Sequence, residues 1–532
     1  MFAPLVYLLL AIPNASAAIL GTTYLTLPPY QPLYARSISP DFFGFSLEFS
    51  EFPYWAGQAV GQPNTFVNQL LANLKKRTGI TPPIRVGGSS EDFGRLNPNV
   101  QIGNASYPNA TASTPYPQAS AVTIGRDWYA LSGNFPSDTK FVWGVAIRPP
   151  TSRNETIAQI KELVRVFQGD RKNVLSGQTL EYLQLGNEPN GWTADWAATF
   201  GAGWSPQNYT KYWLDTAAAV LPYVKLSTNG GTTLLPSGFS GSLNQPPFTN
   251  QYLLGSGLLD DSRVSGNITA VNFHKYSGFR SSAVTLAPPG TLQSKNNVFQ
   301  NWTSYSVDAN YVHTYGKKVV FGETNSYANH GLPNLSNTAE AAVWGVSYLL
   351  GGAALGVDRL HFHNGYGYVY NALAPGTNVS DGLNYTRQHI GPLYYSTVVV
   401  AEAIGSSGNT YVAELTSTNN TISAYGIWEG KRLARMVLTN HDTFNVNGTN
   451  STEERTSQLV NLKSFGLVDV NVGTATIKSL KIPYTNAQRN ITWAGQTFDT
   501  ASGSPEGTVT EPYLSGNVIN VEANSVHLIC FK

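Results

Sequence analysis

Two glutamates occupy similar places in two short apolar segments of the chain. The segment LQLGNEPN reaches Glu188 after an apolar run, and VVFGETNS reaches Glu323 in the same way. Only 12% of the residues are charged, so an acidic side chain at the end of an apolar run calls for a role. Two carboxyl groups facing each other can divide nucleophilic and acid/base work between them.

The segments around these glutamates alternate between apolar runs and helical patterns. Helical spacing is clear at Thr65–Gly79, Glu155–Phe167 and Thr338–Gly356. The expected strands are Asp41–Phe49, Pro83–Gly88, Lys140–Pro149, Leu180–Pro189, Val224–Gly230, Ile268–Ser277, Lys317–Ser326 and Asp358–Tyr366. Such alternation implies a parallel sheet with right-handed crossovers. The sequence therefore predicts an α/β fold, a (β/α)8 TIM barrel.

The pattern changes after Pro392. Short strand-like runs separated by Gly, Asn and Thr turns predict a C-terminal antiparallel β-sandwich over residues 393–532. The catalytic barrel is expected over residues 35–392, and residues 18–34 are expected to add a strand to the sandwich. Residues 1–17 have the apolar run and small residues of a signal peptide.

The barrel gives the two glutamates a common location. Ligands of such barrels bind at the carboxyl ends of the strands, where Glu188 ends the fourth strand and Glu323 the seventh. One glutamate at a strand end is more often a salt-bridge or rim residue, so the prediction depends on the pair. Carboxyl groups about 5 to 5.5 Å apart hydrolyse glycosides with retention of configuration. The pair therefore predicts a retaining glycosidase.

Neighbouring polar residues fit this chemistry. Asn187 precedes Glu188 and is placed to donate an amide hydrogen bond to a sugar 2-hydroxyl. Tyr276 ends the sixth strand, and a phenol that donates to the nucleophile would keep that carboxylate ionised. His274 lies on the same strand end, where a core position and a site position are equally consistent with the sequence. Glu91 and Asp92 are expected to be loop or cap residues.

The segments LGNEPN, NFHKYS, FGETNS and RLHFHNGYGY together resemble glycoside hydrolase family 79, the β-glucuronidases and heparanase-like enzymes. The resemblance covers essentially the whole chain after the predicted signal peptide. It implies Glu188 as acid/base and Glu323 as nucleophile of a double displacement. Glu48 and Ser89 match positions that contact ring hydroxyls.

The same resemblance implies how a uronate carboxylate is bound. Gly367 and Tyr368 match the loop that receives this group through a backbone N–H and a phenol, with the Tyr276 hydroxyl beside them. Tyr327 lies about one residue from the position of the family's aromatic residue. His361 is expected either to orient a loop or to touch the sugar.

Composition narrows the function. The net charge is +1 and no run of Lys or Arg is present, which argues against nucleic-acid binding. The same neutrality favours exo-acting hydrolysis of terminal β-linked glucuronic acid, possibly 4-O-methylated, over endo-cleavage of the heparanase type. A non-catalytic carbohydrate-binding protein is the alternative outside the enzymes. No third ligand accompanies His361 and His363, so no metal and no cofactor are expected.

The sequence also indicates the cellular location. Cys530 is the only cysteine, and no apolar run approaches the roughly 20 residues that span a membrane. Sequons for N-linked glycans occur at Asn104, Asn109, Asn154, Asn267, Asn301, Asn334, Asn378, Asn384 and Asn490. These features predict a secreted, extracellular glycoprotein without a membrane anchor.

Overall fold

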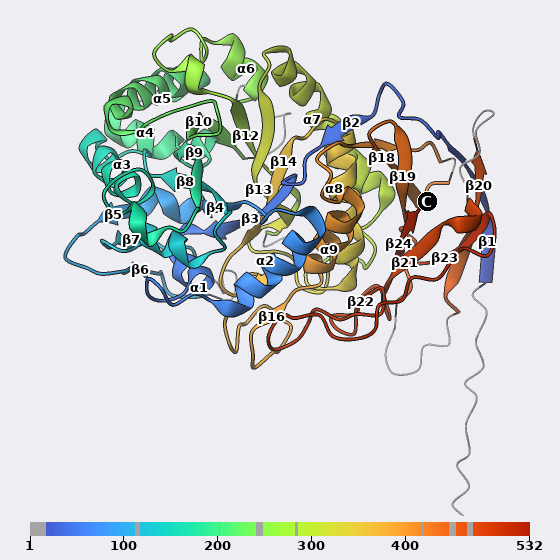
Figure 1. Ribbon diagram of the computed structural model, residues 1–532. Helices are drawn as coiled ribbons and strands as arrows, with labels where there is room; N and C mark the ends of the chain where they lie inside the picture. The colour runs from blue at the N-terminus through green and yellow to red at the C-terminus, as the bar shows by residue number, and fades with distance from the viewer. Residues whose placement is uncertain are drawn as a thin grey trace, which may run out of the picture.

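The computed structural model describes residues 18–111, 117–201, 203–240, 248–281, 286–417, 419–445, 454–464 and 472–531. The predicted signal peptide, residues 1–17, lies outside the described residues. A large α/β body carries a smaller all-β body on one side (Figure 1).

The α/β body is built around one parallel sheet with the strand order β10-β9-β8-β4-β3-β14-β13-β12-β11. These strands are β3 (Phe43–Glu48), β4 (Ile84–Gly87), β8 (Lys140–Val145), β9 (Thr179–Leu185), β10 (Thr233–Leu235), β11 (Ser237–Phe239), β12 (Ala270–Phe279), β13 (Lys318–Ala328) and β14 (Arg359–Asn364). A parallel bridge between Leu234 of β10 and Ile268, two residues before β12, connects the two sides of the sheet. The predicted (β/α)8 barrel is thereby confirmed.

The fifth strand position differs from the expectation. Residues 224–230 form no strand, and the position is filled by the short pair β10 and β11. Pro236 lies between these two strands, and Gly238 has a φ of 81°. Pro and Gly both weaken the sequence signal of a strand. The predicted strand therefore lies a few residues before the observed pair.

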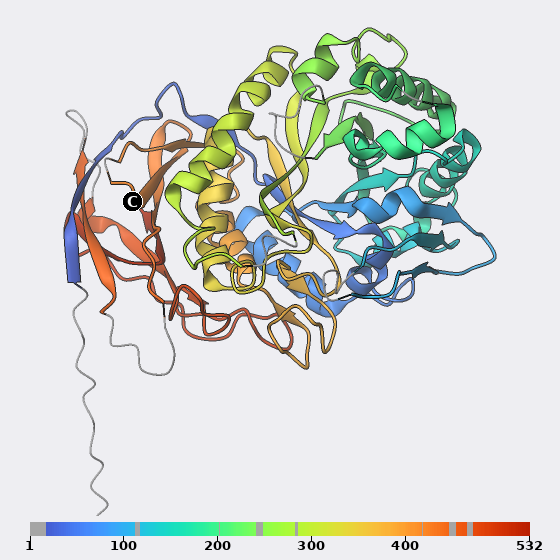
Figure 2. The same ribbon diagram turned by 180° about the vertical axis from the view of Figure 1, so that it is seen from behind.

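Helices surround the barrel, as Figures 1 and 2 show from opposite sides. They are α1 (Phe52–Ala56), α2 (Thr65–Thr78), α3 (Arg153–Phe167), α4 (Thr193–Phe200), α5 (Pro206–Val220), α6 (Asn250–Gly255), α7 (Lys295–Thr314), α8 (Ala339–Ala354) and α9 (Leu393–Ile404). Local signals fix their ends: Ser152 and Glu155, for example, form a capping box at the start of α3. None of the helices among the described residues could cross a membrane.

Helix α9 begins one residue after the expected end of the barrel. It packs against α8 and α2, so it belongs to the ring of barrel helices. Its sequence LYYSTVVVAEAI is rich in β-branched residues, which favour strands by propensity. Tertiary packing overrides that preference here, and the barrel extends to Ile404.

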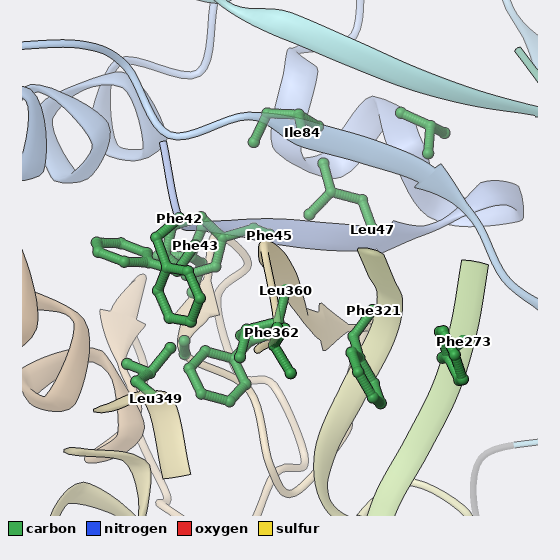
Figure 3. Close-up of a cluster of buried hydrophobic side chains, with 14 of the residues drawn as sticks. Phe42, Phe43, Phe45, Leu47, Ile84, Phe273, Phe321, Leu349, Leu360 and Phe362 are labelled. Carbon is green, nitrogen blue, oxygen red and sulfur yellow. The ribbon is translucent and has the colours of Figure 1, made fainter. Parts of the chain in front are cut away.

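The apolar core lies between the strands and the helices. Phe321 of β13 meets Trp302 of α7 at a ring distance of 5.2 Å, and Phe362 of β14 meets Trp344 of α8 at 5.9 Å. Figure 3 shows Phe321, Phe362 and Leu349 among the clustered side chains. Phe321 and Phe362 point outward to the helices. Because side chains alternate across a strand, alternate residues of these strands face the inside of the barrel. The interior face is therefore free to carry polar groups.

The all-β body contains two sheets. One has the order β2-β17-β18-β19-β24-β21-β22 and the other the order β1-β20-β23. Their strands are β1 (Ala18–Leu27), β2 (Arg36–Ile38), β17 (Thr410–Glu414), β18 (Ile422–Glu429), β19 (Arg432–Asn440), β20 (Thr456–Ser464), β21 (Thr476–Lys481), β22 (Thr492–Trp493), β23 (Val518–Glu522) and β24 (Ser525–Cys530). The predicted β-sandwich is confirmed, and both β1 and β2 from the N-terminal side join its sheets.

Candidate active site

A cavity of about 540 Å³ lies at the carboxyl ends of the barrel strands. Its lining residues are Glu48, Ser89, Gln118, Glu188, Ser240, Lys275, Tyr276, Gly278, Phe279, Tyr305, Glu323, Ala328, Asn329, His330, His363, Tyr368 and Tyr370. Six of the predicted site residues are among them: Glu48, Ser89, Glu188, Tyr276, Glu323 and Tyr368. The structure thus brings both predicted catalytic glutamates to one cavity.

Glu188 follows β9 in an uncommon backbone conformation. Its φ of 45° lies in the left-handed region, which L-residues with side chains rarely adopt. His274 Nδ1 lies 3.1 Å from Glu188 Oε1, and 28% of the Glu188 side chain is exposed. Glu188 is therefore the carboxyl group of the pair that has access to solvent.

The two glutamates lie close together across the barrel mouth. One carboxylate oxygen of each and a ring nitrogen of His274 all lie within 4.8 Å of one another. Inverting glycosidases hold their carboxyl groups about 6.5 to 9.5 Å apart to admit a water molecule. The spacing seen here matches the retaining class, in which one carboxylate attacks the sugar directly.

Glu323 is buried between two donors. Arg85 Nη1 donates to its Oε2 at 2.7 Å, and the Tyr276 hydroxyl donates to its Oε1 at 2.8 Å. Burial alone would raise the pKa of Glu323, but the electrostatic interactions with His363, His274 and Arg85, together with the Tyr276 hydrogen bond, hold it well below its usual range. Glu323 is therefore an ionised carboxylate, the state that a nucleophile requires.

Arg85 of β4 lies behind Glu323 and Asn187, outside the cavity lining, and was not singled out from the sequence. Its guanidinium is fully buried and donates to Gln184, Ser46 and Asn187 at 3.0, 2.9 and 2.9 Å, in addition to Glu323. The planar five-donor fork of Arg suits such a set of simultaneous contacts. A charged residue inside the apolar segment PIRVGG was the only signal for it.

Glu48 is bound from three directions. Ser90 donates to its Oε1 through the backbone N–H at 3.0 Å and through its hydroxyl. His363 Nε2 lies 3.1 Å from Oε2, and the Tyr368 hydroxyl reaches the same oxygen at 3.5 Å. Burial raises the pKa of Glu48, but the bonds from His363 and Ser90 lower it more, so the carboxylate is available as an acceptor for sugar hydroxyls.

The remaining predicted residues lie at different distances from the cavity. His274 bridges the two glutamates, and Asn187 is held by Arg85 behind Glu188. The Tyr327 ring packs against Gly278, where a Cβ atom would come within 2.3 Å of it. Gly367 has a φ of 79° in the loop that carries Tyr368. Tyr327 and Gly367 stand outside the cavity lining.

His361 is not at the site, contrary to one of the two roles expected for it. Its Nδ1 lies 3.2 Å from the Phe321 carbonyl oxygen, and burial lowers its pKa to about 3. The ring faces the barrel interior one layer below His363, which is the histidine that reaches Glu48. Residues two apart on a strand share a face but differ in depth, and depth is not visible in the sequence.

Glu91 and Asp92 are more than the loop or cap residues that were expected. Both are buried, and burial raises the pKa of Asp92 to about 8 and that of Glu91 well above its usual range. Glu91 lies 3.6 Å from Arg85, and Asp92 accepts from the Asn187 backbone N–H at 3.4 Å. Glu91 and Asp92 therefore help to hold Arg85 and the Asn187 backbone in position.

Tyr370 and His330 line the cavity and were not predicted. The Tyr370 hydroxyl lies 3.5 Å from that of Tyr276, and the His330 ring stacks on Tyr368 with centroids 3.9 Å apart. The alternation of tyrosines in NGYGYVYN was a usable signal for Tyr370. His330 lies in a loop, where no periodic pattern applies.

Glu188, His274 and Glu323 are also the one group among the described residues whose ligand atoms are close enough to hold a metal ion. Both Glu323 oxygens, however, already accept hydrogen bonds from Arg85 and Tyr276. This donor set fits a positioned nucleophile better than a metal ligand.

Two facing glutamates of this kind at the mouth of a (β/α)8 barrel define a glycoside hydrolase.

Comparison with known families and proteins specifies the class. Residues 424–528 match the glycosyl hydrolase family 79 C-terminal beta domain. A β-glucuronidase of Aspergillus niger is 31% identical over 87% of this chain and 84% of its own length. A β-glucuronidase of Neurospora crassa is 29% identical over 78% of this chain and 74% of its own length. The chain belongs to glycoside hydrolase family 79, as its motifs predicted.

Solved structures agree on the fold. A 4-O-α-L-rhamnosyl-β-D-glucuronidase from Fusarium oxysporum superposes with a TM-score of 0.75 at 22% identity, covering 95% of this chain and all of that one. A xyloglucanase of glycoside hydrolase family 44 from Paenibacillus polymyxa has a TM-score of 0.53 at 10% identity, with 96% and 99% of the two chains covered. The arrangement of barrel and sandwich is thus shared among glycosidases of different families.

Proposed function

We propose that this chain is a retaining, exo-acting β-glucuronidase. The observation that carries the proposal is the facing pair of Glu188 and Glu323, with ligand atoms within 4.8 Å of each other and of His274. The β-glucuronidase names of the two relatives support the choice of sugar. The substrate is a glycan or glucuronide that ends in β-linked glucuronic acid, with or without a 4-O-methyl group.

The proposed reaction begins at Glu323. Its Oε1 or Oε2 attacks the anomeric carbon while Glu188 protonates the leaving oxygen, which gives a glucuronyl ester and free aglycone. Glu188 then removes a proton from water, and that water displaces Glu323 from the sugar. The 28% exposure of the Glu188 side chain lets solvent reach it for this second step. Two displacements at one carbon retain the β configuration.

Recognition of the uronate is assigned to neutral donors. Burial and nearby carboxylates raise the pKa of Tyr276, Tyr368 and Tyr370 well above the usual phenol range, so all three remain protonated. In the proposed complex the Tyr368 hydroxyl and, as the family resemblance implies, the Gly367 N–H bind the C6 carboxylate, because the single proton of the Tyr276 hydroxyl is already donated to Glu323. Glu48, which lies beside Tyr368, and Ser89 are assigned to the ring hydroxyls.

Exo action is favoured over endo-cleavage of an acidic polymer. Lys275 is the single Lys or Arg among the described residues that line the cavity, so the site lacks the basic cleft that a polyanion needs. A cavity of about 540 Å³ also suits a ligand of a few rings rather than a long chain. A carbohydrate-binding protein without activity has no use for an ionised Glu323 beside a solvent-accessible Glu188.

We also propose that the protein is secreted and carries N-linked glycans. Of the nine sequon asparagines named above, seven are exposed: Asn104, Asn109, Asn154, Asn334, Asn378, Asn384 and Asn490. Asn267 and Asn301 are half-buried. The mass lost on treatment with an endoglycosidase, measured on protein from the culture medium, tests both statements.

A panel of aryl β-glycosides tests the function. The expected result is a kcat/KM for p-nitrophenyl β-glucuronide well above those for the β-glucoside, β-xyloside and β-galactoside. Because a site built to bind one polar group leaves its donors unpaired without that group, the difference can reach roughly 10⁴-fold. Equal or reversed values would reject the glucuronide while leaving the retaining mechanism open to separate test.

A further inference from the structure

The cavity has two sides with different chemistry. Glu48, His363 and Tyr368 lie on β3 and β14 or the loop that follows, next to the nucleophile Glu323. Glu188, Ser240 and Lys275 lie on or directly after β9, β11 and β12. Since the acid must reach the glycosidic oxygen, the leaving group departs on the Glu188 side. The second set of residues therefore lines the space for the aglycone.

Lys275 is the unusual member of this aglycone side. It is only 7% exposed, its Nζ donates to Asn301 Oδ1 at 3.0 Å, and the same atom lies 4.6 Å from the centre of the Tyr305 ring. An ammonium group has three N–H donors, and Asn301 takes one of them. Among the described residues no carboxylate lies within salt-bridge distance of Lys275, although most buried cations of this protein have one.

A buried charge without a counterion is costly, and proteins normally pair it or neutralise it. Burial lowers the pKa of Lys275 to about 8, so the ammonium form still predominates at neutral pH. No other Lys or Arg among the described residues lines the cavity. The missing counterion and the position on the cavity wall point to the same conclusion, an anion that arrives with the substrate.

We propose that Lys275 binds a carboxylate or sulfate on the leaving group, so that the enzyme prefers glycosides with an acidic aglycone. Tyr305, whose ring lies next to Lys275 Nζ, and the 58% exposed Phe279 also line the cavity and offer faces for a sugar or aryl ring. The proposal rests on the proposed function for the identity of the acid Glu188, but it concerns the aglycone and does not depend on the sugar being glucuronic acid.

The test uses two substrates that differ only in charge. These are the β-glucuronides of 4-hydroxyphenylacetate and of 4-hydroxyphenylacetamide, whose methylene group insulates the phenol and keeps the two leaving groups similar. The wild type is expected to show the higher kcat/KM with the acid. In Lys275→Met, the kcat/KM for the acid should fall at least about tenfold more than that for the amide, the size expected for a hydrogen bond to a charged group.

A matched control removes a lysine elsewhere. Lys211 of α5 is 78% exposed and pairs with Asp215, so Lys211→Met should leave the ratio of the two substrates unchanged. A sulfated phenol of similar length, used as a third substrate, separates carboxylate from sulfate as the preferred anion.

Two outcomes overturn the proposal: a wild type without preference for the acid, or an equal loss on both substrates in Lys275→Met, which leaves the ratio of the two kcat/KM values as in the wild type. The last would place Lys275 against the glucuronate carboxylate itself or in a structural role. If glucuronides are not hydrolysed at all, the proposed function fails instead. The same acid and amide aglycones on the sugar that the enzyme accepts then still decide the role of Lys275.

Discussion

The Tyr276 hydroxyl and the Glu323 carboxylate are 2.8 Å apart, on the opposite side of Glu323 from Arg85. Each carboxylate oxygen of Glu323 therefore has one fixed donor, and the carboxylate cannot rotate without losing both. Tyr276 contributes position and charge stabilisation at once. This double restraint makes Glu323 the residue whose removal has the clearest consequence.

Glu323→Gln should abolish turnover without loss of the fold. The amide keeps the shape of the side chain but cannot form the glucuronyl ester, so kcat should fall by about 10³-fold or more. Arg85 retains its hydrogen bonds to Gln184, Ser46 and Asn187, which limits the destabilisation. Activity on p-nitrophenyl β-glucuronide and a thermal unfolding curve check the two parts. Near-wild-type turnover by folded Glu323→Gln protein would exclude Glu323 as the nucleophile.

Glu188→Ala should stall the enzyme at the covalent intermediate. A good leaving group such as p-nitrophenolate needs little protonation, so the ester still forms but water is no longer activated. Azide, which needs no general base, should restore turnover and give a β-glucuronosyl azide. Product analysis by NMR reports the anomer, and an α-azide would contradict double displacement.

Tyr276→Phe should move the acidic limb of the pH profile to higher pH. The pKa of Glu323 in the folded enzyme lies well below its usual range, partly through the Tyr276 hydroxyl. Without that bond the pKa rises, and protonated, inactive Glu323 accumulates at a higher pH than in the wild type. A hydrogen bond to a charged group is worth about 1.5 to 3 kcal/mol, which corresponds to a rise of roughly one pH unit or more in the pKa of Glu323.

The control for this shift is Tyr348 of α8, which contacts the outer face of β13, the strand that carries Glu323. The Tyr348 hydroxyl lies 2.7 Å from that of Thr324, away from the cavity. Tyr348→Phe should lower the melting temperature slightly and leave the pH dependence of kcat/KM as it is. If both variants move the acidic limb equally, the effect is one of stability and not of the Tyr276 contact.

Tyr368→Phe should narrow the preference for glucuronides over glucosides. Its hydroxyl lies 3.5 Å from Glu48 and is assigned to the uronate carboxylate, which a glucoside does not have. Loss of one donor to a charged group should reduce kcat/KM for the glucuronide about tenfold and change the glucoside little. The ratio of the two kcat/KM values is the measurement. An equal reduction for both substrates would assign Tyr368 to the ring hydroxyls or to packing.

The sequence predicted the parts of this protein that follow local rules. Glu188 and Glu323 were singled out because each follows an apolar run of a predicted barrel strand; in the structure Glu188 follows β9, Glu323 lies within β13, and both line the cavity. The barrel followed from the alternation of strands and helices. Arg85 was missed because its importance depends on Ser46, Gln184 and Glu323 converging on it from three other strands.

Other differences have equally specific causes. Helix α9 has strand-like composition, and Pro236 divides the fifth strand into β10 and β11. His361 and His363 differ by one layer of depth in the barrel, and only the upper one reaches Glu48. The depth of a residue in the barrel, the convergence of distant side chains and the effect of packing on a helix all depend on the folded chain. A single sequence therefore predicts them poorly.

The pairing of β1 with β20 has a consequence for how the chain matures. Ala18 at the start of β1 aligns with Thr456 of β20, and the whole barrel lies between them in the sequence. During synthesis β1 emerges first, yet its partner is translated only after the last barrel helix. The N-terminal strand must therefore wait unpaired until the C-terminal domain is complete, and closing so distant a contact is slow. Truncation of the last strands would thus leave both ends of the polypeptide exposed to chaperones and proteases.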